Sequence, residues 1–211
     1  MENVITIIAA VVMAYLLGSF PAGFLLGKLW GVNVLEWGSG RTGGTNVLRS
    51  AGVLPALLTG AIDVGKGALA VWVAGLIAPE THQAITQMLA GVAVILGHNY
   101  SIFLGFRGGA GVGTSLGALS VIYWPAAIAL LVLLLLIVAI TRYASLGSLI
   151  VTTLMPVVLL ALASTGVLPP AYVGFGLLAW IIIVYEHRPN IRRLIEGTER
   201  RIGDRKQPHS S

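Results

Sequence analysis

Apolar residues occur along this chain in long blocks separated by short polar segments. The blocks cover residues 4–30, 53–77, 84–104, 112–140, 146–164 and 171–185. A helix needs about 20 apolar residues to cross the ~30 Å hydrocarbon core of a bilayer, whereas the strands of a membrane barrel show short alternating segments. The pattern therefore predicts an all-α protein, a polytopic membrane helix bundle.

The block 112–140 decides the topology. As a single helix it would place Arg142 and the arginine-rich C-terminal segment on the membrane side opposite two glycine-rich segments, although Lys and Arg normally gather on the cytoplasmic side. A break at Tyr123-Trp124-Pro125 removes the conflict, because proline interrupts a helix. We therefore expect helices over 112–122 and 126–140. The chain then has seven transmembrane helices, with the N-terminus outside and the C-terminus cytoplasmic.

The helix over 112–122 would be only about 17 Å long, too short to cross the membrane. It must begin inside the bilayer, so the preceding glycine-rich loop is expected to be re-entrant. Non-helical backbone at that depth is tolerated only where protein or a water-filled cavity surrounds it. In the first block, Gly18-Ser19-Phe20-Pro21 predicts a kink or a close-packing point.

Composition and charge agree with this class. Of the 211 residues, 56% are hydrophobic and 10% charged, against about 25% charged residues in soluble domains. We expect a single integral membrane domain over residues 1–211. The net charge is +5 and seven of the thirteen Lys and Arg follow His187, which is typical of a basic cytoplasmic tail (about 187–211) and not of nucleic-acid binding. The chain has no cysteine, which excludes disulfides and cysteine metal sites.

A first glycine-rich segment, residues 38–49, lies between the first two blocks. Glycine lets backbone approach a ligand closely, and arginine binds phosphate or carboxylate through forked donors. Thr45 and Asn46 are expected to cap a helix whose first N–H groups face the loop. One interpretation is an anion cradle; the other is a glycine-rich turn with arginines at the membrane surface. The candidate residues are Ser39, Arg41, Gly43, Thr45, Asn46 and Arg49.

A second glycine-rich segment opens the helix predicted at 112. Backbone N–H groups at a helix start, with the helix dipole behind them, favour an anion. No Lys-Ser or Lys-Thr follows the last glycine, so the segment is not a Walker loop and ATP binding is not expected. The alternative is a small-residue contact between membrane helices. The candidate residues are Arg107, Gly108, Gly109, Gly111 and Thr114.

Other polar residues interrupt or end the apolar blocks. Asp63 and Lys66 are three positions apart on one helix face, so they can pair and brace a site from within a span. His98, near the end of another span, is more typical of a satisfied packing partner than of a catalyst. His187 and Asn190 lie where the last span leaves the membrane, and His187 can act as a base or donate to a phosphate. No metal-binding or serine-hydrolase motif is present.

The tail continues with Arg192, Arg193, Arg200 and Arg201, which we interpret as a basic surface against the anionic membrane leaflet.

Five motifs carry a resemblance to a known family. They are Gly38-Ser-Gly…Thr45-Asn-Val-Leu-Arg49, Asp63-Val-Gly-Lys66-Gly, Gly97-His-Asn-Tyr-Ser-Ile-Phe-Leu104, Gly108-Gly with Gly111-Val, and His187-Arg…Asn190-Ile…Leu194…Gly197-Thr-Glu199. In this order they resemble the bacterial acyl-phosphate:glycerol-3-phosphate acyltransferase family of integral membrane enzymes. The match covers nearly the whole chain and its motifs are specific.

The resemblance implies transfer of a fatty acyl group from acyl phosphate to the 1-hydroxyl of glycerol 3-phosphate, giving lysophosphatidic acid in phospholipid synthesis. It implies no cofactor or metal, and no need for acyl carrier protein or coenzyme A. The expected location is the bacterial cytoplasmic (inner) membrane, with the active site on the cytoplasmic face. Two phosphate-bearing substrates suit two anion cradles, and an acyl tail suits a site beside membrane lipid.

In this resemblance Ser39, Arg49, His187 and Asn190 match catalytic positions. The resemblance makes the remaining candidates of the two glycine-rich segments substrate-binding residues. It gives Asp63, Lys66 and His98 a structural role in supporting the site.

Two departures from the family pattern stand out. Arg41 and Gly44 replace the usual Asn and Ala, and Ala110 replaces a lysine that the resemblance makes a phosphate ligand. Arg41 is therefore a candidate to supply the missing positive charge; the alternative is that it faces lipid head groups. Two other functions stay open at this point, a small-molecule transporter and a catalytically impaired homologue.

Overall fold

The computed structural model describes residues 2–203, so the part of the predicted tail beyond 203 lies outside the described residues. Nine α-helices and three short 3-10 helices are assigned within that range. The α-helices are α1 Glu2–Ser19, α2 Ala22–Leu29, α3 Gly44–Ser50, α4 Val53–Ile77, α5 Gln83–Asn99, α6 Val112–Thr141, α7 Ala144–Ser164, α8 Ala171–Glu186 and α9 Arg188–Ile195; the 3-10 helices are η1 Val34–Glu36, η2 Glu80–His82 and η3 Ile102–Leu104.

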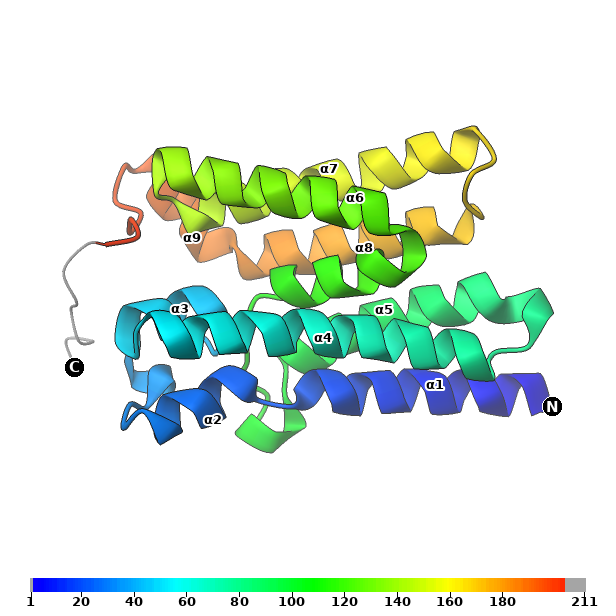
Figure 1. The fold of residues 1–211 in the computed structure, drawn as a ribbon, viewed down its shortest axis with the longest axis horizontal. Helices are drawn as coiled ribbons and strands as arrows, with labels where there is room; N and C mark the ends of the chain where they lie inside the picture. Colours follow the sequence, from blue (N-terminus) through cyan, green and yellow to red (C-terminus); the bar gives the residue numbers. More distant parts are fainter. Residues whose placement is uncertain (1, 204–211) are drawn as a thin grey trace.

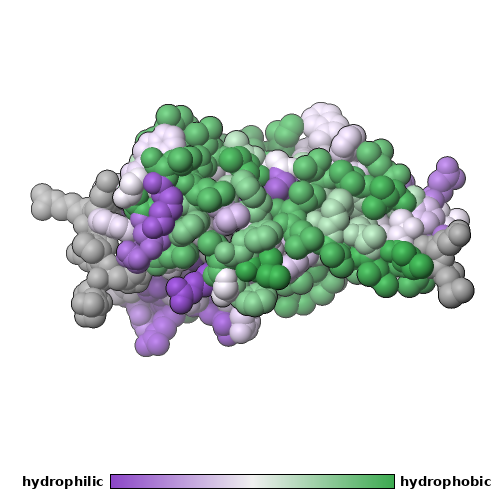
Figure 2. Space-filling view, turned by 90° about the horizontal axis from the view of Figure 1, so that it is seen from below, coloured by the Kyte–Doolittle hydropathy of each residue, from purple (hydrophilic) through white to green (hydrophobic). Residues whose placement is uncertain are grey.

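The long helices lie side by side along the long axis of the molecule (Figure 1). Most of the surface in Figure 2 is apolar, and hydrophilic residues gather mainly toward the end that carries α2, α3 and α9, which we call the polar end. Four helical stretches are long and apolar enough to cross a membrane, and α8 is a shorter apolar helix. The predicted all-helical membrane architecture is confirmed at this level. The four stretches are Asn3–Leu29, Val53–Ile77, Val112–Thr141 and Ala144–Ser164.

The predicted break inside the block 112–140 is present. Tyr123 has non-helical dihedral angles (φ −158°, ψ 92°), two residues before Pro125, and the chain reverses direction there (Figure 1). The second half of α6 consequently runs back to the polar end, whereas the first half begins nearer the middle of the molecule (Figure 1). Gly108, just before α6, accepts a hydrogen bond from Thr42, and Arg142, just after it, accepts one from Ile202.

Of two other expected helix limits, the break in the first apolar block is confirmed and the end of the third block is wrong. The first apolar block is interrupted at Phe20-Pro21, between α1 and α2, as the glycine-proline motif predicts. The third block does not extend to residue 104: α5 ends at Asn99 and a 3-10 turn follows. Gly105 adopts a left-handed conformation (φ +60°), which lets the chain fold back toward α5.

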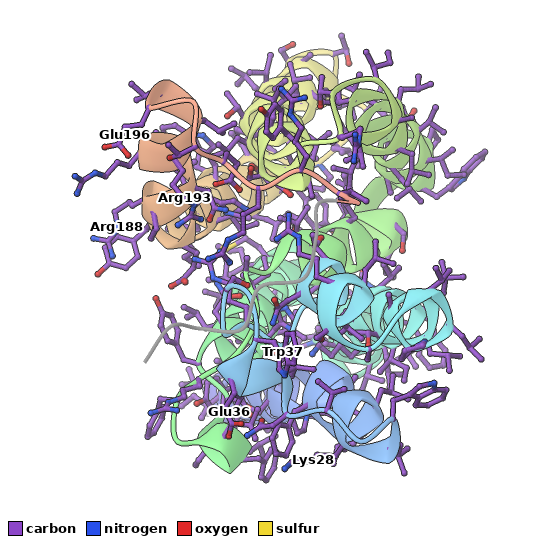
Figure 3. All side chains as sticks on the ribbon, turned by 90° about the vertical axis from the view of Figure 1, so that its left-hand side faces the viewer. Lys28, Glu36, Trp37, Arg188, Arg193 and Glu196 are labelled. Atoms are coloured by element: carbon purple, nitrogen blue, oxygen red, sulfur yellow. The ribbon has the colours of Figure 1, made fainter. Side chains whose placement is uncertain are left out.

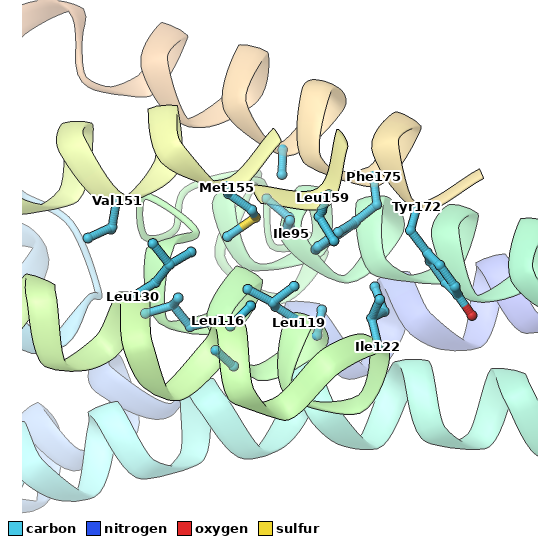
Figure 4. Close-up of a cluster of buried hydrophobic side chains, with 14 of the residues drawn as sticks. Ile95, Leu116, Leu119, Ile122, Leu130, Val151, Met155, Leu159, Tyr172 and Phe175 are labelled. Carbon is cyan, nitrogen blue, oxygen red and sulfur yellow. The ribbon is translucent and has the colours of Figure 1, made fainter. Parts of the chain in front are cut away.

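The buried interior has two parts. The larger apolar cluster joins α5, both halves of α6, α7 and α8; in Figure 4, Leu116 and Leu119 face Met155 and Leu159. The smaller cluster joins α1, α4 and α5 and consists of six alanines and Val94. Small residues let membrane helices approach closely. A Cβ added at Gly97 would collide with the Tyr15 carbonyl of α1, so this unit offers a rigid support for the polar end.

Candidate functional site

The first glycine-rich loop is organised by Asn46. Its Nδ2 donates to the carbonyls of Val34 (2.9 Å) and Arg41 (2.8 Å), and its Oδ1 accepts from Ser39 N (3.1 Å). The capping prediction is wrong, because α3 begins at Gly44 with Gly43 as its N-cap. Gly43 has the extended conformation (φ −73°, ψ 156°) that precedes a helix. Asn46 therefore lies inside α3 and uses its amide to shape the loop.

The second glycine-rich loop lies directly beside the first. Thr42 N donates to Gly108 O (3.1 Å), and Gly109 N donates to His98 O (2.9 Å). Gly111 is the N-cap of α6 and has φ +85°, a conformation that favours glycine. Sequence reasoning missed Thr42, whose backbone joins the two loops and whose side chain is buried.

Arg41 links the first loop to the end of α8. Its guanidinium donates to the Glu186 carbonyl and to Asn190 Oδ1 (3.4 Å), and lies 3.6 Å from the Glu186 carboxylate. Burial lowers the pKa of Arg41, which the Glu186 charge partly opposes, but arginine stays protonated. Only 22% of this side chain is exposed, so Arg41 is turned toward the end of α8 and the start of α9.

His187 is held as a neutral ring. Its Nδ1 lies 2.8 Å from Ile183 O, and the residue is buried. Because a carbonyl only accepts, Nδ1 carries the proton in this contact and Nε2 keeps its lone pair. Burial lowers the pKa of His187 and the positive charge of Arg41 lowers it further, against the Ile183 hydrogen bond. The group therefore suits a proton acceptor near neutral pH.

The C-terminal segment folds back over the polar end through Glu199. This buried carboxylate accepts hydrogen bonds from Ser145 (2.9 Å), Asn190 (2.8 Å) and Arg193 (2.7 Å). Burial alone would raise the pKa of Glu199, but these hydrogen bonds outweigh it and the pKa is lowered. We call the set Arg41, Glu186, Asn190, Arg193 and Glu199 the terminal network. Glu186 and Glu199 were not predicted as site residues, although Glu186 directly precedes the His187–Glu199 motif and Glu199 ends it.

The sequence suggested that the arginines of the tail form one basic surface. The structure shows that they do not. Arg193 lies on the side of α9 that faces the molecule, whereas Arg188 and Glu196 project outward (Figure 3). Arg49 donates to the Arg200 carbonyl (3.0 Å), which brings the tail next to the first loop. Arg192 remains 81% exposed. Of the predicted surface arginines, Arg193 thus belongs to the terminal network through its side chain, and Arg200 approaches the first loop through its backbone carbonyl.

Beneath the loops lies a second polar cluster, which we call the buried triad: Asp63, Lys66 and His98. Lys66 Nζ lies 2.8 Å from Asp63 Oδ1 and 2.8 Å from His98 Nδ1, and it also donates to Phe20 O (3.1 Å). The predicted Asp63–Lys66 pair is confirmed. A Cβ at Gly109 would collide with the His98 ring, so the triad supports the second loop from below.

The remaining predicted residues are more peripheral. Ser39, Thr45 and Arg107 are exposed, and Arg107 lies on the turn that a β-bridge closes with Ser101. Thr114 is fully buried in the first turn of α6. Among residues 2–203, no group of three His, Cys, Asp or Glu side chains that could hold a metal ion is found.

Two glycine-rich loops, the buried ring of His187 and an apolar surface thus meet at one end of the bundle. Residues 8–197 match the family model described as glycerol-3-phosphate acyltransferase. The chain belongs to the glycerol-3-phosphate acyltransferase family. A relative named glycerol-3-phosphate acyltransferase from Carboxydothermus hydrogenoformans is 41% identical over 201 residues, 95% of this chain and 98% of the relative. One from a Synechococcus species is 40% identical, covering 92% and 94%.

Solved structures agree with this family assignment. The crystal structure of PlsY (YgiH), an integral membrane glycerol 3-phosphate acyltransferase, in its glycerol 3-phosphate form matches with a TM-score of 0.83 and 34% identity, covering 93% of this chain and 96% of that one. Its lysophosphatidic acid form matches with a TM-score of 0.81. The resemblance stated from the motifs is confirmed at the level of the family.

Proposed function

We propose that this acyltransferase takes a fatty acyl group from acyl phosphate and transfers it to the 1-hydroxyl of glycerol 3-phosphate, releasing lysophosphatidic acid and inorganic phosphate. The observation that carries the proposal is the hydrogen-bonded junction of two glycine-rich loops beside His187 and Asn190. The named ligand forms of the matched PlsY structures support glycerol 3-phosphate as acceptor. Acyl phosphate as donor, without coenzyme A, acyl carrier protein or a metal, follows from the resemblance.

The first loop holds one phosphate in this proposal. Ser39, Thr45 and Arg49 supply donors, and Asn46 keeps the loop in shape through its three backbone contacts. The amides of Gly108 and Gly111, with Arg107, hold the polar head of the other substrate, and Gly109 fixes the loop through its hydrogen bond to His98 O. Charged hydrogen bonds to phosphate are roughly twice as strong as neutral ones, which suits substrates that must be drawn from water and membrane to one place.

Arg41 supplies the positive charge of the family lysine that Ala110 replaces in this chain. Its guanidinium contacts both Glu186 and Asn190. Its positive charge also lowers the pKa of His187. A fork of N–H donors at that point can turn from Asn190 to a substrate phosphate, although a guanidinium and an ammonium differ in geometry. The positive charge of the site is thereby kept, and its position changes. This role makes the chain an active member of the family and not an impaired one.

The chemical step needs one proton acceptor. The 1-hydroxyl oxygen bonds to the acyl carbon, the carbon–phosphate oxygen bond breaks, and phosphate leaves with the electron pair. The hydroxyl proton goes to His187 Nε2 or to a phosphate oxygen of the substrate. His187 and Asn190 orient glycerol phosphate, and acyl phosphate is activated enough that no covalent enzyme intermediate is required. Positioning and charge stabilisation then lower most of the barrier.

The proposed setting is the bacterial inner membrane, with seven spans, the N-terminus outside and the polar end cytoplasmic. The reversal at Tyr123 and the gathering of hydrophilic residues at the polar end (Figure 2) support this topology. Single cysteines at Glu80, Tyr123 and Val167 are expected to react with an impermeant thiol reagent from outside, and one at Gly197 only from inside. Labelling of Tyr123→Cys from the cytoplasm alone would contradict the proposed topology.

The deciding experiment is an activity assay on the purified full chain with acyl phosphate and radiolabelled glycerol 3-phosphate. We expect labelled lysophosphatidic acid together with an equal amount of inorganic phosphate. Arg49→Ala is expected to lower the rate about 30- to 1,000-fold, because a lost charged contact costs about 2–4 kcal/mol in the transition state. Uptake of substrate into vesicles without product would instead indicate a transporter. If neither product nor uptake is observed, the chain is an inactive homologue.

A further inference from the structure

Asn99 is a buried polar residue that the proposed reaction has not yet used. It is the last residue of α5 and only 4% exposed. Neither its Nδ2 nor its Oδ1 has a hydrogen-bond partner within residues 2–203. A buried amide without a partner destabilises a folded protein, so such a group deserves a functional explanation.

The amide is aimed at the start of α6. A Cβ added at Gly111 would lie 3.0 Å from Asn99 Oδ1 and 3.5 Å from its Nδ2, so the side chain lies against the N-cap of that helix. The first intrahelical bond of α6 runs from Ser115 N to Gly111 O. The three N–H groups before Ser115 therefore have no intrahelical acceptor. The hydroxyl of Thr114, in the same turn, is also buried and unpartnered within the described range.

The position of Asn99 is rigid. The carbonyl of the preceding residue, His98, accepts from Gly109 N (2.9 Å), and a Cβ at Gly108 would collide with the backbone carbonyls of both His98 and Asn99. The end of α5 and the loop before α6 thus hold each other in place. Donors that are fixed before a reaction stabilise developing charge without reorganising.

We propose that Asn99 Nδ2 and the first N–H groups of α6 form the oxyanion hole for acyl transfer. This inference rests on the proposed function. When the 1-hydroxyl oxygen bonds to the acyl carbon, the electron pair of the C=O double bond moves onto the carbonyl oxygen, which receives these hydrogen bonds. The pair returns as the bond to the phosphate oxygen breaks and phosphate leaves with its own pair. The hydroxyl proton follows the route given above.

The chemistry of the group favours a carbonyl oxygen over a phosphate. An amide is neutral, and its Oδ1 would repel the additional oxygens of a phosphate. Two of the positive side chains that suit phosphate, Arg41 and Arg49, belong to the first loop, and the third, Arg107, is exposed on the turn five residues before α6. A half-turn of the amide exchanges Nδ2 and Oδ1, so the donor can face α6 while the oxygen faces away from it.

The test compares acyl transfer with hydrolysis of acyl phosphate in the absence of glycerol 3-phosphate. An oxyanion hole serves attack by either hydroxyl or water. Asn99→Leu, which keeps the size and removes the polar atoms, is expected to lower kcat of both reactions by about 100- to 1,000-fold. The KM for glycerol 3-phosphate is expected to change little, and Tm to stay or rise because an unpaired buried amide is removed. Asn190→Ala, on the acceptor side, should lower transfer and spare hydrolysis.

Asn3→Leu removes an amide from an exposed position of α1 at the opposite end of the bundle and should behave as the wild type. The inference is overturned if folded Asn99→Leu keeps both rates within about threefold, or loses transfer alone. Asn99→Asp provides a second variant that loses the donor and adds a repelling charge. If neither variant folds, Asn99 is a structural residue and the inference fails. An inactive wild type would refute the proposed function itself.

Discussion

The two polar clusters of this acyltransferase differ in how completely their charges are enclosed. The buried triad comes from two helices, and the side chains of Asp63, Lys66 and His98 are each under 8% exposed. The terminal network comes from a loop, a helix end and the tail, and Arg41 and Arg193 keep 22% and 29% exposure. We interpret the charges enclosed by helices as structural. The partly exposed charges of the terminal network can instead exchange a protein partner for a substrate.

The largest effect is expected from breaking the triad. Asp63→Ala leaves the Lys66 ammonium buried without its carboxylate, and removing one partner of a buried ion pair typically costs about 3–5 kcal/mol. We expect a strongly lowered Tm and little folded protein after purification. Asp63→Leu combined with Lys66→Leu should recover part of the stability, because no lone charge remains. A stable Asp63→Ala variant would show that the triad is not structural.

In the terminal network the largest effect is expected on activity. Arg41→Asn should reduce turnover about 30- to 1,000-fold, the equivalent of ~2–4 kcal/mol in transition-state binding, with Tm nearly unchanged. Ala110→Lys added to that variant should restore most of the rate if the two positions supply the same charge. A double-mutant cycle measures this coupling. Additive effects, with Arg41→Asn close to the wild type, would leave Arg41 without a role in binding.

Acidification is expected to destabilise the polar end through His187 and Glu199. The pKa of His187 is lowered in the fold, so the unfolded chain binds this proton first and stability falls as pH drops below about 6.5. The pKa of Glu199 is also lowered, so a second loss follows as pH falls below about 4.3, toward the folded-state value.

Tm recorded from about pH 8 down to about pH 2 should therefore decrease in two steps. His187→Gln should flatten the first step and Glu199→Gln the second. The same series of rates tests the proton acceptor: if His187→Gln keeps the wild-type pH–rate profile, a substrate oxygen takes the proton. A Tm that rises on acidification would contradict both assignments.

The smallest effects separate two neighbouring arginines of α9. Arg193 bonds to Glu199, whose side chain is 3% exposed, whereas Arg192 bonds to Glu196 in solvent. Arg192→Ala should change stability by about 0–1 kcal/mol, as for exposed ion pairs. Arg193→Ala should cost more, about 1–2 kcal/mol, and should also reduce activity by loosening Asn190. Equal effects of the two changes would place Glu199 outside the functional network.

Much of the architecture was predictable because it depends on local patterns. Apolar blocks of membrane-spanning length, the break before Pro125, the break at Pro21 and the i, i+3 pairing of Asp63 with Lys66 all follow from short-range geometry and from the exclusion of unpaired backbone from lipid. The motifs were also sufficient for the family, since they specify several residues at once in a fixed order.

The wrong predictions concern side chains that are bonded by a neighbouring loop or turn. Asn46 was expected to cap a helix, but tertiary contacts with Val34 and Ser39 use its amide inside α3. The arginines of the tail were expected to form one surface, but Glu199 folds Arg193 inward. Neither outcome follows from helix periodicity, because each depends on how the adjoining loop folds back onto the side chain.

The sequence by itself determined that this protein is a helical membrane bundle of the glycerol-3-phosphate acyltransferase family. Hydropathy and motif order depend only on the order of residues along the chain, so no tertiary contact is needed to detect them. Only the tertiary structure decided that Thr42 joins the two loops, that Arg41 reaches Asn190, and that Asn99 lies beneath the start of α6. The physical reason is that hydrogen bonds and close packing depend on positions within a few ångströms, which are set when the helices pack.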